Sequence, residues 1–325
     1  MESPDAREEF STLGGTALLV LEDDGSVQEP ASRKVSEALR QLPCPTLLCP
    51  TESHAVLEAN RREYFPHIDV VLDDRKALPN IVDNAGAAPL AALTTVQLLR
   101  HSRARSIPEG LFAESLAYGI LQAGPEFASW RKRTPLMNKA IVSDGPPVLV
   151  SREQSVLRLV FNRPEIRNAF SYAARDALVE ALQLPLLDDS IERIEFSAVG
   201  SSFCSGGHLD EFGSLSDAVS AHATRTTRSA GAELNRSRER AFARVHGACI
   251  GAGVELPSFC GHVTAARETF FQLPEIAMGL CPGAGGTASI PARIGRERTT
   301  YMALSAERID TERALAWGLI DKLED

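Results

Sequence analysis

Two glutamates in the C-terminal half have the side chain and the surroundings for acid–base chemistry. Glu255 lies in the segment GVEL and Glu275 in the segment LPEI, so both are flanked by apolar residues. Apolar surroundings indicate a partly buried site, where burial shifts the pKa of a carboxyl group. The alternative is that both are solvated surface acids, the common fate of glutamate. The two residues by themselves leave this choice open.

Glycine-rich segments precede or follow both glutamates. They are FCSGGHLDEF (203–212), HGACIGAGVEL (246–256) and FFQLPEIAMGLCPGAGGT (270–287). Each one alone is consistent with a tight turn, a strand-to-helix corner or the entry to a helix. Small residues also let a backbone amide come close to a ligand. The three segments are therefore best interpreted together, as parts of one candidate site.

Composition limits the class of protein. The chain has 325 residues, 44% of them hydrophobic and 24% charged, with a formal net charge of −9. These values are typical of a globular protein, and the acidic charge argues against nucleic acid as a partner. No apolar run approaches the ~18 residues of a membrane span. The acid-rich first ten residues do not resemble a signal peptide, so the sequence predicts a cytoplasmic protein without a membrane partner.

No metal or separate cofactor is predicted. The six cysteines form neither a CxxC pair nor a cluster of zinc spacing, and free thiols are the better interpretation. The glycine-rich segments contain no GxxxxGK[ST] loop, and no GxGxxG follows a predicted strand.

The N-terminal part is predicted to form two units. Strand-like runs at 16–22, 46–49 and 68–73 alternate with helical patterns at 31–42 and 53–64, which predicts a small α/β unit over residues 1–80 of unknown role. From 87 to 133 the pattern is helical, with a break at Pro108, and we assign 81–140 to a helical unit. The proline-containing stretch 134–147 marks the next boundary.

Residues 147–325 alternate strands and helices again. Strands are predicted at 156–162, 191–199, 243–250 and 263–266, a polar helical stretch at 214–243, and three helical segments between 283 and 320. Ser171 is placed to cap the helix that follows it. This alternation predicts a mainly parallel, covered sheet.

The region 147–325 resembles the crotonase superfamily, the enoyl-CoA hydratases and isomerases. The resemblance rests on motifs in the family order and spacing, namely Asn162-Arg163-Pro164 with Asn168-Ala169, FCSGGHL, IGAGVEL, LPEIAMGLCPGAGGT and AWGLIDK. It implies an α/β fold with a crotonase-like ββα spiral core, here preceded by an α/β plus helical region. It also implies an acyl-CoA substrate, of which coenzyme A is a part, and no further cofactor.

The resemblance implies roles for individual residues. The backbone N–H groups of Ser205 and Ala252 would form an oxyanion hole for the thioester oxygen, and Glu255 and Glu275 match the two acids of the hydratases. The implied substrate-binding residues are Gly206, Gly207, His208, Gly251, Gly253, Pro282 and Gly283. His208 stands where the family commonly has Asp, and we interpret it as a polar neighbour of coenzyme A.

The presence of both glutamates favours hydration of a 2-enoyl-CoA to a 3-hydroxyacyl-CoA. The alternatives are an enoyl-CoA double-bond isomerase and a non-catalytic acyl-CoA-binding protein. Family members usually continue past the GLIDK-like segment into helices that complete the pocket and build a trimer. We expect residues 88–133 to take the place of those helices, the alternative being an accessory helical domain with unrelated packing. A homo-oligomer, a trimer or hexamer, is expected.

Overall fold

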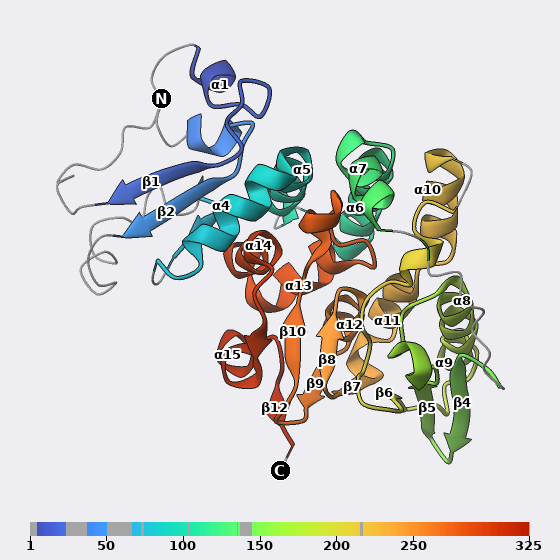
Figure 1. Ribbon diagram of the computed structural model, residues 1–325. Helices are drawn as coiled ribbons and strands as arrows, with labels where there is room; N and C mark the ends of the chain where they lie inside the picture. Colours follow the sequence, from blue (N-terminus) through green and yellow to red (C-terminus); the bar gives the residue numbers. More distant parts are fainter. Residues whose placement is uncertain are drawn as a thin grey trace.

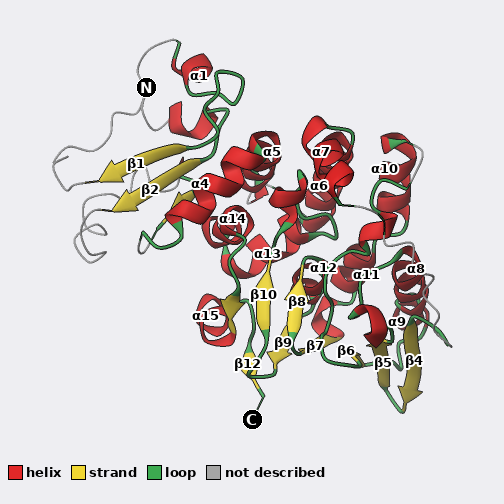
Figure 2. Ribbon diagram, viewed as in Figure 1, coloured by secondary structure: helices red, strands yellow, loops and turns green. Residues whose placement is uncertain are grey.

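The computed structural model describes residues 5–23, 38–50, 67–72, 75–102, 105–134, 136, 145–214 and 217–324. A small N-terminal sheet lies at one end and a larger sheet at the other, with most of the helices between them (Figure 1). Figure 2 shows helices over one face of the larger sheet, the face that is turned toward the middle of the molecule. Among the described residues, no helix is both long and apolar enough to cross a membrane.

The N-terminal sheet has three parallel strands in the order β1-β2-β3. They are β1 (Leu19–Asp23), β2 (Thr46–Pro50) and β3 (Val70–Val71), preceded by the short helix α1 (Ala6–Glu9). All three predicted strands are thereby confirmed. The helix expected at 53–64, and most of that expected at 31–42, lies outside the described residues.

A buried set of charged residues, the Asp69 cluster (Asp69, Arg100 and Arg296), joins this sheet to the helices. Arg100 Nη2 donates to Asp69 Oδ2 at 2.6 Å, and Arg296 Nη1 to Asp69 Oδ1 at 3.3 Å. The backbone N–H and hydroxyl of Thr46 also donate to Asp69 Oδ2, at 2.8 and 2.9 Å. The Asp69 side chain is 1% exposed. Every oxygen of this carboxylate is therefore paired.

Four helices follow, and they include both predicted helical runs on either side of Pro108. They are α4 (Leu78–Ala87), α5 (Pro89–Arg100), α6 (Ile107–Gln122) and α7 (Pro125–Arg133). Pro108 does not break a helix but lies in the first turn of α6, where a missing N–H is tolerated. Of the apolar residues that recur at helical spacing in this region, Val96 and Leu99 are buried, whereas Leu116 and Ile120 are exposed.

The larger sheet has the strand order β12-β9-β7-β6-β5-β4. The strands are β4 (Val148–Glu153), β5 (Val156–Phe161), β6 (Arg193–Ala198), β7 (Ala241–Val245), β9 (His262–Ala265) and β12 (Lys322–Leu323). Only the β4–β5 pair is antiparallel, so the mainly parallel sheet is confirmed. The strand β4 was not predicted.

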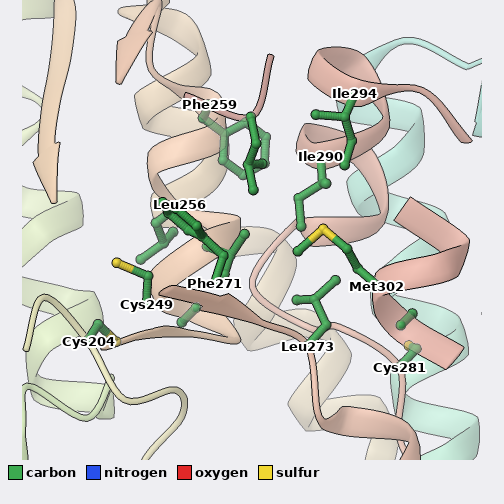
Figure 3. Packing of buried hydrophobic residues seen from close by; sticks show 14 of the residues in the cluster. Cys204, Cys249, Leu256, Phe259, Phe271, Leu273, Cys281, Ile290, Ile294 and Met302 are labelled. Atoms are coloured by element: carbon green, nitrogen blue, oxygen red, sulfur yellow. The ribbon is translucent and has the colours of Figure 1, made fainter. Parts of the chain in front are cut away.

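A second small sheet carries the candidate site. It contains β8 (Ala248–Ile250), β10 (Phe270–Gln272) and β11 (Ile309–Asp310), in the order β11-β10-β8. The helices α12 (Ala252–Glu255), α13 (Gly286–Ile294), α14 (Arg296–Ser305) and α15 (Thr311–Trp317) accompany it, and the last three confirm the helical segments expected after 283. Figure 3 shows Phe259 and Phe271 facing Ile290 and Met302 across the apolar core between these elements.

The remaining helices are α8 (Tyr172–Ala181), α9 (Leu184–Leu187), α10 (Ala218–Thr227) and α11 (Ala230–Arg236). The predicted cap is confirmed, because Ser171 Oγ accepts the Ala174 N–H at 3.2 Å. The polar helical stretch expected over 214–243 is present, but it consists of separate helices and ends before residue 243. Asp217 and Ser229 each cap a separate helix through a side-chain oxygen, and β7 begins at Ala241. Two N-cap side chains so close together favour two short helices.

Candidate active site

A cavity of about 380 Å³ lies where α6, α8, α10, α11 and α12 meet. Its wall is largely apolar, and Leu111, Phe112, Phe170, Phe212 and Leu256 contribute to it. The two acids predicted for the site, Glu255 and Glu275, both line this cavity. The structure thus brings the two predicted acids to the same cavity, from different elements.

The backbone around Glu275 is adapted to its position. Glu275 opens the 3₁₀ helix η8 (Glu275–Met278), which follows β10. Gly251, between β8 and α12, has φ = 51°, and a Cβ there would lie 2.6 Å from Glu275 Oε1. Glycine alone meets both requirements, the left-handed backbone and the close approach.

The N-terminus of α13 holds Glu255 through backbone amides. Ala284 N–H and Gly286 N–H both donate to Glu255 Oε2 at 2.8 Å. The alternate amides of the same stretch donate to a third carboxyl group, that of Glu114 on α6. Gly285 N–H donates to Glu114 Oε1 at 2.7 Å, and Thr287 N–H to Glu114 Oε2 at 2.8 Å. Four successive amides are therefore divided between two glutamates.

Glu114, Glu255 and Glu275 together form what we call the glutamate cluster. All three line the cavity. Burial raises the pKa of Glu255 well above its usual range, and the neighbouring Glu275 and Glu114 raise it further. Burial also raises the pKa of Glu275 to about 8 and that of Glu114 to about 7. At neutral pH the cluster therefore retains protons, and its members titrate together.

The two predicted acids differ in hydrogen bonding. Glu255 Oε2 accepts two backbone N–H groups, which favour its carboxylate form. Glu275 Oε2 is buried and has no hydrogen-bond partner among the described residues. A buried carboxyl oxygen without a donor is costly as an anion, so the hydrogen bonds favour the proton on Glu275. Burial and the two neighbouring acids act against this choice, because they raise the pKa of Glu255 as well. We give the hydrogen bonds the greater weight, because burial affects both acids whereas the two amides favour the anion at Glu255 alone.

Of the two amides predicted for the oxyanion hole, only one lies at the cavity. Ala252 lines it, but Ser205 does not, and the Ser205 N–H donates to Arg167 O at 3.0 Å. Gly207 lines the cavity instead. Phe170 N–H donates to Gly206 O at 2.7 Å, and His208 N–H donates to Phe170 O at 3.0 Å, which makes a parallel bridge between Phe170 and Gly207. Because peptide groups alternate along a strand, the N–H of Gly207 points away from Phe170.

The predicted substrate-binding residues divide in a similar way. Gly207 and Gly283 line the cavity, whereas Gly206, His208, Gly251, Gly253 and Pro282 do not. The glycines behind the wall permit close backbone packing, since a Cβ at Gly253 would lie 2.4 Å from Cys204 O. His208 Nδ1 is buried without a partner among the described residues. Among these residues, no group of three or more His, Cys, Asp or Glu is placed to hold a metal ion.

Among the cavity residues that no sequence motif indicated are Glu114, Tyr118 and Arg225. Tyr118 covers Gly283, where a Cβ would lie 2.4 Å from its ring. The only local signal for Glu114 is its place in the apolar helical run LFAESLAYG, where a charged side chain is unexpected on a buried face. Its partners on α13 lie far along the chain, so spacing alone does not reveal them.

The C-terminal half of the chain is similar to known proteins. Residues 151–324 match the family model described as enoyl-CoA hydratase/isomerase. The 2,3-dehydroadipyl-CoA hydratase of Escherichia coli is 35% identical over 173 residues, which cover 53% of this chain and 67% of the relative. The mitochondrial Delta(3,5)-Delta(2,4)-dienoyl-CoA isomerase of Mus musculus is 29% identical, over 54% of this chain and 57% of its own length. The chain thus spans only part of the length of these relatives.

Solved structures show the same relationship. An enoyl-CoA hydratase from Mycobacterium smegmatis superposes with a TM-score of 0.51 at 28% identity, covering 55% of this chain and 70% of the other. The family model covers residues 151–324, a range that includes Ala252, Glu255 and Glu275 of this chain. By this match and by the fold, the chain belongs to the enoyl-CoA hydratase/isomerase family, within the crotonase superfamily.

Proposed function

We propose that this protein adds water across the C2=C3 double bond of a 2-enoyl-CoA thioester and yields a 3-hydroxyacyl-CoA. The observation that carries this proposal is the pair Glu255 and Glu275 on one cavity wall, both with a raised pKa. Hydration needs two proton transfers, one from the attacking water and one to the α-carbon. Two carboxyl groups that share one proton supply both at neutral pH.

The backbone amides of Gly207 and Ala252 are proposed to hold the thioester oxygen. Both residues line the cavity, and a Cβ at Gly207 would lie 2.5 Å from the Phe212 ring, so a larger residue there would have to displace that ring. Negative charge develops on the thioester oxygen as the nucleophile attacks C3. Two fixed N–H donors stabilise that enolate, and the loss of one such donor typically costs ~3 kcal/mol of barrier. We therefore transfer to Gly207 the role expected for Ser205.

The hydrogen bonds assign the two acids different tasks. Glu255, whose Oε2 is held by two amides, is the carboxylate that takes a proton from water as the water oxygen bonds to C3. Glu275, whose Oε2 lacks a donor among the described residues, gives its proton to C2. Water is consumed, one C–O and one C–H bond form, and proton exchange with solvent restores the starting state.

The helical unit is proposed to stand in for the C-terminal helices of the family. This proposal is supported by α6, which contributes Leu111, Glu114 and Tyr118 to the cavity wall. Gly110 makes the close crossing of α6 and α13 possible, because a Cβ there would lie 2.9 Å from Ala288 Cβ. A trimer or hexamer stays a prediction, which sedimentation of the purified protein would test.

The proposal is tested with crotonyl-CoA and longer 2-enoyl-CoA substrates, by the loss of absorbance of the enoyl thioester. Glu255→Gln and Glu275→Gln should each lower kcat by ~100-fold or more, since each removes one proton-transfer group. Glu153→Gln is the matched control, because Glu153 is an exposed glutamate at the end of β4. This control should keep the activity of the parent.

Two results would contradict hydration. Conversion of a 3-enoyl-CoA to the 2-enoyl isomer, with no hydration of the 2-enoyl product, would make the protein an isomerase. Binding of acyl-CoA without any turnover of 2-enoyl or 3-enoyl substrates would make it a non-catalytic binding protein.

A further inference from the structure

Three arginines line the cavity, and two of them are neutralised by acids of α8. Arg175 pairs with Asp176 at 2.9 Å. Arg228 lies 3.4 Å from Asp176 and 3.7 Å from Glu180. Arg225 has no carboxylate within ion-pair distance in the part of the chain that the structure describes. Its positive charge is therefore unpaired on the cavity wall.

The position of Arg225 is fixed by α6. Its Nε donates to Ser115 Oγ and its Nη2 to Ser115 O, both at 3.1 Å. The guanidinium carbon lies 4.9 Å from the centroid of the Tyr118 ring, a cation–π contact. Gly119 leaves room, since a Cβ there would lie 3.3 Å from Nη2. These bonds use one edge of the guanidinium and leave Nη1 without an acceptor among the described residues.

The neighbouring acid does not satisfy this charge. Glu114 raises the pKa of Arg225, but both of its oxygens accept N–H groups of Gly285 and Thr287. Burial acts in the opposite direction and is the larger effect, so the pKa of Arg225 is lowered from its usual range. A guanidinium still keeps its proton at neutral pH. Partly buried cations without a carboxylate partner are uncommon in proteins, because burial of an unpaired charge is costly.

We propose that Arg225 is a specificity-determining residue that receives a carboxylate at the far end of the acyl chain. The substrate class would then be enoyl-CoA thioesters whose acyl group ends in an acid rather than a methyl group. This inference rests on the proposed function of the cavity. A guanidinium edge binds a carboxylate through two parallel charge-assisted hydrogen bonds, and the apolar wall would enclose the methylene groups between the two ends.

The phosphates of coenzyme A are a second source of anionic groups. The contacts of Arg225 place it on the side of the cavity where the acyl group would lie, near the glutamates. The guanidinium stacks on Tyr118, whose ring covers Gly283. Gly283 immediately precedes the amides of 284 and 286 that hold Glu255. We therefore assign Arg225 to the acyl chain and use free coenzyme A as the ligand that tests the other source.

The test measures binding of adipyl-CoA, hexanoyl-CoA and free coenzyme A by calorimetry. The two thioesters have the same chain length and lack the reactive double bond, so the result does not depend on turnover. The parent should bind adipyl-CoA ~10- to 100-fold more tightly than hexanoyl-CoA, as expected for a charged hydrogen-bond pair. Arg225→Gln should abolish this preference, and Arg225→Lys should retain part of it. Arg228→Gln should leave the ratio between the two thioesters as in the parent.

Equal affinity of the parent for the two thioesters would overturn the inference. So would a loss of affinity in Arg225→Gln that is equal for adipyl-CoA and hexanoyl-CoA. A matching loss for free coenzyme A would assign Arg225 to the phosphates. Thermal melting of each variant shows whether it is folded, and Arg225→Lys keeps the test open if Arg225→Gln is not. Failure of the proposed function would give a different result. The parent would then still bind adipyl-CoA more tightly than hexanoyl-CoA, but it would hydrate no 2-enoyl-CoA.

Discussion

The Asp69 cluster and the glutamate cluster are both buried, but they are built in opposite ways. In the Asp69 cluster, a carboxylate is surrounded by donors from Arg100, Arg296 and Thr46. In the glutamate cluster, carboxyl groups come together without a cation in ion-pair distance among the described residues, and the only donors are amides and one hydroxyl. The first cluster joins three parts of the chain. The second lines a cavity.

This difference fits a stabilising role for the Asp69 cluster and the catalytic role that we propose for the glutamate cluster. A fully paired carboxylate keeps its charge and has no free oxygen with which to act on a substrate. Glu275, in contrast, has a buried oxygen without a partner in the described part of the chain and a pKa raised to about 8. Groups in such an unfavourable environment are typical of active sites, where a proton must be held and released near neutral pH.

The largest effect on the free energy of unfolding is expected from a substitution in the Asp69 cluster. Asp69→Asn removes the charge that balances Arg100 and Arg296, whose side chains are 7% and 6% exposed. Leaving buried cations uncompensated should lower the free energy of unfolding by ~3–5 kcal/mol, as measured by urea denaturation. The activity per folded molecule should stay that of the parent, because the cluster lies outside the cavity lining.

The matched control is Asp188→Asn. Asp188 also pairs with an arginine, Arg152, but the two side chains are 45% and 38% exposed. The urea midpoint of this variant should equal that of the parent, since solvent screens exposed pairs. An equal loss in both variants would show that burial is not what distinguishes the Asp69 cluster.

The glutamate cluster should make the stability of the protein depend on pH. A carboxyl group with a raised pKa binds more protons in the folded than in the unfolded state, so it lowers stability as pH rises. For Glu275 the affected range extends from its ordinary value of 4.5 to about 8. Each such group contributes at most ~1.4 kcal/mol per pH unit within its range. Glu275→Gln, which imitates the protonated acid, should match the parent near pH 4.5 and be more stable at pH 8. An unchanged difference between the two proteins across this range would refute the raised pKa.

The positions of Glu255 and Glu275 could be predicted because their motifs are local. Each acid lies within a short segment of glycines and apolar residues, IGAGVEL for Glu255 and LPEIAMGL for Glu275, that can be recognised in the sequence itself. The same holds for the Ser171 cap, which depends on an N–H three residues away. Interactions of this kind are contained in the neighbouring sequence.

Other features depend on contacts between distant segments and could not be predicted. The Ser205 N–H donates to Arg167 O, and Gly207, which is bridged to Phe170, lines the cavity instead. The short strands β10 and β11 pair with each other across a long stretch of chain. Glu114 is the clearest case, because its helix has no functional motif and its partners lie on α13.

The smallest of these effects is expected at Glu114, which combines features of both clusters. Like Asp69 it has donors at both oxygens, and like Glu275 it is buried without a paired cation and has a raised pKa. Glu114→Gln keeps the shape, but its amide nitrogen cannot accept an N–H, so one amide of 285 or 287 loses its partner. We expect a loss of ~1–3 kcal/mol of unfolding free energy at pH 6, and a smaller loss at pH 9, where the parent carries a buried charge. Because the adjacent amides hold Glu255, kcat should fall about tenfold while KM changes little, a modest loss of acid–base catalysis.

Thr287→Val, which removes only the hydroxyl donor to Glu114, is the control and should lower stability less and leave kcat unchanged. A normal kcat in Glu114→Gln would place Glu114 with Asp69, as a residue that joins α6 to α13 and does nothing further for the chemistry.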